Sequence, residues 1–149
     1  MKERADGSGR HTLSYGLRLG VTGSQTPIFE NYFAGGFSTM RGFDFRGASP
    51  ENQGVIVGGE LRFLGSVEYM VPLTADDMLR GVFFTDFGTV EEQLSIHSED
   101  FRVVVGFGLR VSIPMMGPAP LALDLAFPLA REDTDDIRNF SFFFGFGRL

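Results

Sequence analysis

The stretch FRVVVGFGLRVSI, residues 101–113, alternates apolar and polar side chains with a period of two residues. One face of an extended chain would carry Phe101 and every second residue after it, all of them apolar. The opposite face would carry small residues together with Val104, Arg102 and Arg110. Successive side chains of a β-strand point to opposite faces of a sheet, so this pattern predicts a strand with one apolar and one mostly polar face.

Five further segments show the same alternation: residues 11–21, 55–73, 79–90, 121–129 and 139–149. The charges within these strands fall on the polar face and are of both signs. They are Arg18, Glu60, Arg62, Glu68, Arg80, Asp86, Arg102, Arg110 and Asp124. No segment has the 3.6-residue period of an amphipathic helix. The sequence therefore predicts an all-β fold built from six antiparallel strands.

Composition excludes several classes of site. The 149 residues contain no cysteine and two histidines, so a disulfide framework, a thiolate metal site or a histidine-rich metal site is not expected. A net charge of −6 argues against nucleic-acid binding, which needs a basic face. We find no arrangement of catalytic residues and expect no cofactor. Residues 1–10 lack the apolar core of a signal peptide and are expected to be a disordered polar terminus.

Two architectures place an apolar face opposite a polar one. In a soluble sandwich or barrel the apolar face points inward, whereas in an outer-membrane barrel it points outward to lipid. Most of the predicted strands are 9–13 residues long, close to the ~9–11 that cross a bilayer at a tilt. The connections alternate between long (22–53, 91–100, 131–138) and short (74–77, 114–120). This alternation favours the transmembrane barrel.

The long connection 22–53 contains GGFSTMRGFDFRGASP, residues 35–50. Within it, Met40-Arg41-Gly42-Phe43 resembles the V/I-R-G-F/Y signature of an outer-membrane superfamily. This superfamily, which includes the bacterial surface antigen family, contains BamA-like insertases and two-partner-secretion transporters. Phe84-Thr85-Asp86-Phe87-Gly88 is similar to the F-x-D-x-G motif that follows on a later strand of that family.

The resemblance implies a lumen latch. In the family, the loop folds back into the barrel and its arginine contacts the acidic residue of the second motif. An arginine guanidinium is a rigid fork of donors that a carboxylate can meet at two points. We expect Phe37 and Phe43 to pack the loop tip, and Arg46 to be solvated or a helper contact. The expected latch residues are Met40, Arg41, Gly42, Phe43, Phe84, Asp86 and Gly88.

The resemblance extends over the later strands. Six charged positions are predicted to form a hydrated lumen wall: Glu60, Arg62, Glu68, Arg102, Arg110 and Asp124. The phenylalanine-rich last segment resembles the family's terminal insertion signal. Its expected residues are Phe140, Phe142, Phe144 and Gly145. The acidic run at 132–136 is expected to be a solvated loop.

Six strands are fewer than the eight that the smallest bilayer-spanning barrels have. Family members have sixteen, preceded by periplasmic POTRA domains. We therefore expect residues 11–149 to be the last six strands of a longer chain's barrel, or a subunit that closes by self-association. The implied function is insertion or translocation of unfolded client proteins in the outer membrane, without nucleotide. A passive pore or structural barrel, and a soluble β-barrel binding module, remain as alternatives.

Overall fold

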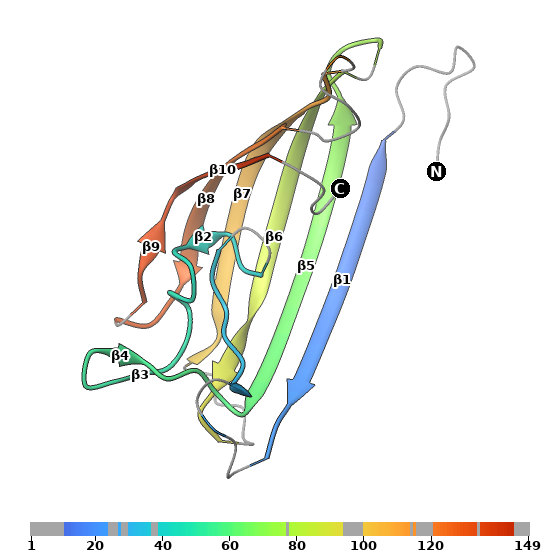
Figure 1. The fold of residues 1–149 in the computed structure, drawn as a ribbon. Helices are drawn as coiled ribbons and strands as arrows, with labels where there is room; N and C mark the ends of the chain where they lie inside the picture. Colours follow the sequence, from blue (N-terminus) through green and yellow to red (C-terminus); the bar gives the residue numbers. More distant parts are fainter. Residues whose placement is uncertain are drawn as a thin grey trace.

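A single curved sheet dominates the computed structural model, which describes residues 11–23, 27, 30–36, 39–76, 78–93, 100–113, 115, 121–133 and 135–144 (side chains of 143 and 144 excepted). Residues 1–10, predicted to be disordered, lie outside this range. Each long strand pairs antiparallel with the next one along the chain (Figure 1). The strands are β1 (Thr12–Val21), β5 (Leu61–Pro72), β6 (Leu79–Glu91), β7 (Arg102–Val111), β8 (Leu121–Ala130) and β10 (Phe140–Phe144). The predicted six-stranded antiparallel fold is confirmed.

Four short strands lie in the connections: β2 (Gly42–Phe43), β3 (Glu51–Asn52), β4 (Val55–Ile56) and β9 (Ile137–Arg138). β3 and β4 form a hairpin whose two turn residues, Gln53 and Gly54, have φ of 53° and 80°. Positive φ at both central positions is typical of a tight hairpin turn. The predicted strand over 55–73 was therefore wrong at its start, because residues 55–56 pair back on 51–52 and β5 begins at Leu61.

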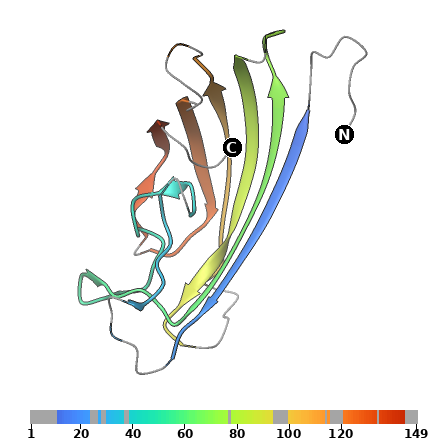
Figure 2. The same cartoon turned by 45° about the vertical axis from the view of Figure 1, so that its right-hand side comes forward.

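The two faces of the sheet differ in what they bury. The outer face leaves large apolar side chains exposed, among them Leu13, Tyr15, Leu17, Leu19, Phe83, Phe107, Phe127, Leu129, Phe140 and Phe142. The segment that contains β2 lies on the concave side of the sheet (Figure 2), and Asp86, Arg110 and Asp124 are buried on this face. A soluble barrel would direct its phenylalanines inward, so this arrangement contradicts the soluble-module alternative. It is the arrangement of a transmembrane barrel wall.

The sheet is open in the part of the chain that the structure describes. β1 and β10 lie at its two edges, and each has one strand neighbour. The six strands thus form part of a barrel wall and not a closed barrel. Among the described residues, no helix is long and apolar enough to cross a membrane.

The orientation of β1 predicts opposite environments for two nearby positions. A nitroxide label at Leu17→Cys should be relaxed by oxygen, which concentrates in lipid, because Leu17 is exposed on the outer face. A label at Ser14→Cys should be relaxed by a water-soluble nickel complex, because Ser14 is opposite the inward-facing Glu68 in the sheet. Residues 1–149 contain no cysteine that would be labelled in addition. Electron paramagnetic resonance of the full protein in membranes measures both, and the reverse pattern would contradict the assignment of the faces.

Candidate functional site

The Met40-Arg41-Gly42-Phe43 motif lies against the concave face of the sheet, with all four residues buried. The close approach depends on Gly42. Its φ is +89°, and a Cβ there would lie 2.8 Å from Val104 Cγ1 and 3.2 Å from Ala126 Cβ. Glycine adopts this backbone conformation at no steric cost. The motif can therefore press its backbone onto β7 and β8 only because residue 42 has no side chain.

Arg41 meets Asp86 at two points. Arg41 Nε donates to Asp86 Oδ2 and Nη2 donates to Oδ1, both at 2.8 Å. The Arg41 backbone N–H also donates to Oδ2, at 3.1 Å, and Ser66 Oγ donates to Oδ1 at 2.6 Å. Both residues have 0% of their surface exposed. This is the bidentate geometry in which arginine–carboxylate bonds are strongest.

Further charges surround this pair and form what we call the arginine cluster: Arg41, Arg110, Glu68, Asp86 and Asp124. Arg41 Nη1 donates to Glu68 Oε2 at 2.6 Å and lies 3.8 Å from Asp124 Oδ2. Arg110 holds Asp124 from the other side, with Nη1 2.5 Å from Oδ1 and Nη2 3.2 Å from Oδ2. Arg41 contacts all three carboxylates, and Arg110 contacts Asp124 and, at 3.9 Å, Glu68. Each buried charge of the cluster therefore has at least one partner of opposite sign.

Phe84 and Gly106 shape the pocket for the Arg41 side chain, and Gly88 allows close packing of β6 on β5. The guanidinium carbon of Arg41 lies 3.6 Å from the centroid of the Phe84 ring, a favourable cation–π position. Gly106 is opposite Phe84 in the sheet, and a side chain there would run into that ring. Gly88 has φ of +151°, and a Cβ on it would lie 2.9 Å from Leu64 Cα.

The charged form of the Arg41 side chain is strongly favoured. Burial by itself lowers the pKa of Arg41, but the hydrogen bonds and charges of Asp86 and Glu68 outweigh burial and raise that pKa above its ordinary value. The arginine is therefore a permanent cation, and it contacts neighbouring groups only as a hydrogen-bond donor. Among the described residues, no group of three or more His, Cys, Asp or Glu side chains is arranged to hold a metal ion.

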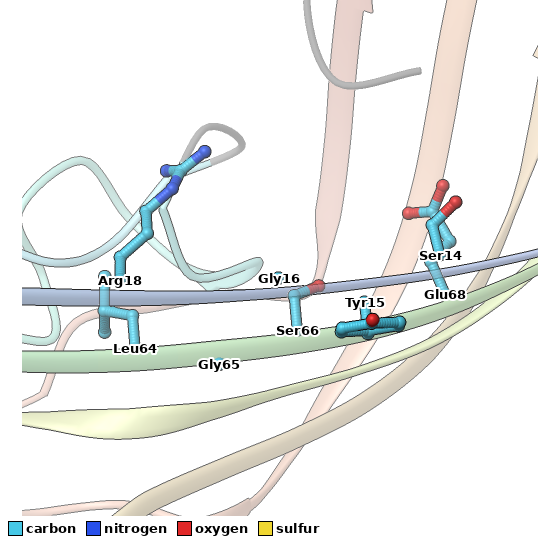
Figure 3. A pocket seen from close by; sticks show the side chains of 8 residues that line it. All are labelled: Ser14, Tyr15, Gly16, Arg18, Leu64, Gly65, Ser66 and Glu68. Carbon is cyan, nitrogen blue, oxygen red and sulfur yellow. The ribbon is translucent and has the colours of Figure 1, made fainter.

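A shallow groove of about 160 Å³ lies beside the cluster and is lined by residues of the paired strands β1 and β5. Its lining residues are Ser14, Tyr15, Gly16, Arg18, Leu64, Gly65, Ser66 and Glu68. Figure 3 shows Ser14, Arg18 and Glu68 projecting from the same side of these strands. Because Ser66 and Glu68 both contact Arg41, the groove belongs to the same site.

The predicted wall residues divide into three groups. Glu68, Arg110 and Asp124 join the arginine cluster, and Glu68 is buried where a hydrated wall was expected. Glu60, just before β5, and Arg62, at its start, are half-buried, and the Arg62 guanidinium lies 4.5 Å from the Tyr32 ring centroid. Arg102 is buried in a separate ion-pair network, described below.

Other predicted residues lie elsewhere. Arg46 is exposed and stacks 4.1 Å from the centroid of the Phe33 ring, which is a helper contact within the loop. Phe140 and Phe142 are exposed on the outer face of β10. Phe144 ends β10, and its side chain lies outside the described part of the structure, as do Phe37 and Gly145 altogether. The role of the last strand as an insertion signal stays a prediction.

Sequence reasoning missed the contacts of the 131–136 segment. Its acidic run was predicted to be solvated, but the Asp135 side chain has 0% exposure and pairs with Arg102. The alternation of side chains in residues 101–113 placed Arg102 on the polar face of the sheet. An arginine buried on that face needs a partner of opposite charge, and this was the signal that the sequence offered. The partner could not be found from spacing, because it lies in a loop 33 residues further along the chain.

Residues 3–147 match the Omp85 superfamily domain. The chain belongs to the Omp85 superfamily. The resemblance based on the two motifs is thereby confirmed at the level of the family. Among the similar curated proteins, a SAM50-like protein of Drosophila melanogaster is 29% identical over 131 residues, which cover 83% of this chain and 28% of that protein.

Two bacterial proteins extend the comparison. The outer membrane protein assembly factor BamA of Neisseria meningitidis is 22% identical over 169 residues, covering 90% of this Omp85 chain and 21% of BamA. The crystal structure of BamA from Haemophilus ducreyi lacking POTRA domains 1–3 has a TM-score of 0.70 at 21% identity, covering 93% of this chain and 31% of that one. This Omp85 chain thus spans less than a third of each relative, and it shares the BamA barrel fold.

Proposed function

We propose that the protein inserts or translocates client proteins at an outer membrane. In this proposal Arg41 and Asp86 latch the motif loop, the connection that contains Met40-Arg41-Gly42-Phe43, to the inner wall. The observation that carries the proposal is the buried two-point contact between Arg41 in the loop and Asp86 on β6, which holds the loop against the concave face. Family membership and the names of the relatives, an assembly factor and a SAM50-like protein, support the same function.

The proposed mechanism needs no bond chemistry and therefore no nucleotide, cofactor or catalytic residue. The barrel wall would offer a pairing edge or a pore to a client strand, while the latched loop stabilises the working conformation. The partners would be membrane lipid on the apolar face and unfolded or partly folded clients. Further strands, from a longer chain or from self-association, would complete the wall, because lipid does not tolerate the unpaired edges of β1 and β10.

The test replaces two arginines of the same loop. Arg41→Ala should reduce the rate of client insertion by about tenfold or more when the full protein is reconstituted in vesicles, since about 1.4 kcal/mol is already a factor of ten. Arg46→Ala is the matched control and should leave the rate within about twofold, because Arg46 is exposed and its contacts with described residues are with the Phe33 and Phe45 rings. Heat-modifiable migration verifies that both variants are folded.

Equal insertion rates for the two variants would contradict the latch. If the unmodified protein conducted ions but inserted no client, it would be a passive outer-membrane pore, the alternative given in the sequence analysis.

A further inference from the structure

A second buried ion pair lies on the inner face, away from the arginine cluster. Arg102 begins β7 and is eight positions before Arg110, which places the two roughly 26 Å apart along the strand. Arg102 Nε donates to both oxygens of Asp135, at 2.8 and 3.0 Å, and Nη2 donates to Oδ1 at 2.8 Å. The side chains of both residues have 0% exposure.

Asp135 also organises the segment in which it lies. Its Oδ2 accepts a hydrogen bond from the Glu132 backbone N–H at 2.8 Å, and its own N–H donates to the Glu132 carbonyl at 3.2 Å. Arg102 Nη1 donates to the Asp100 carbonyl at 3.2 Å. The ion pair therefore connects two segments: the residues just before β7, through Asp100, and the segment after β8, through Asp135.

The anchored segment contacts the motif loop through its backbone. β9 pairs with β2, so that Gly42 is opposite Arg138 and Phe43 is opposite Ile137 (Figure 1). Asp44 N–H donates to the Asp136 carbonyl at 2.8 Å, and Asp136 N–H donates to the Gly47 carbonyl at 2.9 Å. Asp136 follows Asp135 directly, so the residue next to the buried ion pair is the one that bonds to the motif loop.

We infer that Arg102 and Asp135 form a second anchor of the motif loop, acting as positioning residues for Arg41 through the β9–β2 pairing. A two-residue ladder is too short to persist without support. The arginine cluster holds the motif from the wall side, and the Arg102–Asp135 pair holds it from the side of the last connection. The consequence for client insertion rests on the function proposed above.

Two other carboxylates near these loops are natural controls. Glu132 makes one contact with Arg102, at 3.1 Å, and its side chain is 29% exposed. Burial raises the pKa of Glu132, an effect that Arg102 only partly opposes. Asp44 pairs with Arg138 at 3.2 Å and joins the same two loops, but both side chains are largely exposed. Exposed pairs of this kind contribute little.

The experiment is hydrogen–deuterium exchange on the full protein in lipid, comparing Asp135→Ala and Asp135→Asn with Asp44→Asn and Glu132→Gln. Both Asp135 variants should speed exchange in residues 39–47 by about tenfold or more, while β6 stays protected. The two controls should change exchange in that stretch by less than about threefold. Asp135→Asn keeps the shape of the side chain, so it tests the anchor even if Asp135→Ala folds poorly.

Unchanged protection of residues 39–47 in the Asp135 variants would overturn the inference. Loss of protection across the whole sheet would also overturn it, because Asp135 would then support folding in general and not the position of this loop. Exchange is measured without a client. A failure of the proposed insertion function, seen with Arg41→Ala, is therefore distinguishable from a failure of the second anchor.

Discussion

Replacing Asp86 with alanine is expected to lower the free energy of unfolding by about 3–5 kcal/mol, because Arg41 would remain buried without its main counter-charge. Arg41 and Asp86 are both fully buried, so the contact is shielded from water. In a hydrated lumen the same change would have an effect of about 1 kcal/mol or less. Glu68, 2.6 Å from Arg41 Nη1, would still compensate part of the arginine's charge. We therefore expect a loss of unfolding free energy at the lower end of this range.

Denaturant unfolding of the full protein, followed by its heat-modifiable migration, measures this loss. Asp44→Ala is the matched control, since Asp44 also pairs with an arginine but at an exposed position, and it should change stability by less than about 1 kcal/mol. The double variant Arg41→Ala/Asp86→Ala should be less destabilised than the sum of the two single variants, because neither charge is then left alone. Equal effects of Asp86→Ala and Asp44→Ala would contradict the buried latch.

Gly42→Ala is expected to destabilise the protein by roughly 2–5 kcal/mol. About 1–2 kcal/mol comes from placing an alanine at a φ of +89°, and about 1–3 kcal/mol from forcing its Cβ against packed side chains. The nearest atoms are Val104 Cγ1 at 2.8 Å and Ala126 Cβ at 3.2 Å, both in well-packed strands. We expect the loop to lift from the wall, which would also lengthen the Arg41–Asp86 contact.

Gly54→Ala separates the two contributions. Gly54 has a similar φ of +80°, but the one atom near its missing Cβ is Glu51 Oε1, at 4.0 Å. This control should therefore show the backbone strain alone, about 1–2 kcal/mol. Unfolding midpoints of the two variants under identical conditions provide the comparison. If Gly42→Ala is no worse than Gly54→Ala, the motif does not press on the wall as the structure places it.

The strands and the orientation of their faces could be predicted because they depend on local pattern. The period of two along β7 assigns Phe107 outward and Arg110 inward, and the structure agrees at both positions. The start of β5 could not be predicted in this way. Val55 and Ile56 continue the apolar pattern, but the turn at Gln53 and Gly54 directs them back onto β3. Turn geometry overrode propensity there.

The antiparallel sheet and its apolar outer face follow from the local pattern of the sequence, and the two motifs indicate a contact between Arg41 and Asp86. The carboxylate partners of Arg102 and Arg110, in contrast, depend on the tertiary fold. Arg102 and Arg110 lie on the same face of the same strand, yet one is held by the 131–136 segment and the other by β8. Side-chain alternation is a property of neighbouring residues, whereas these partners depend on strand register and loop path, which join positions far apart in the chain.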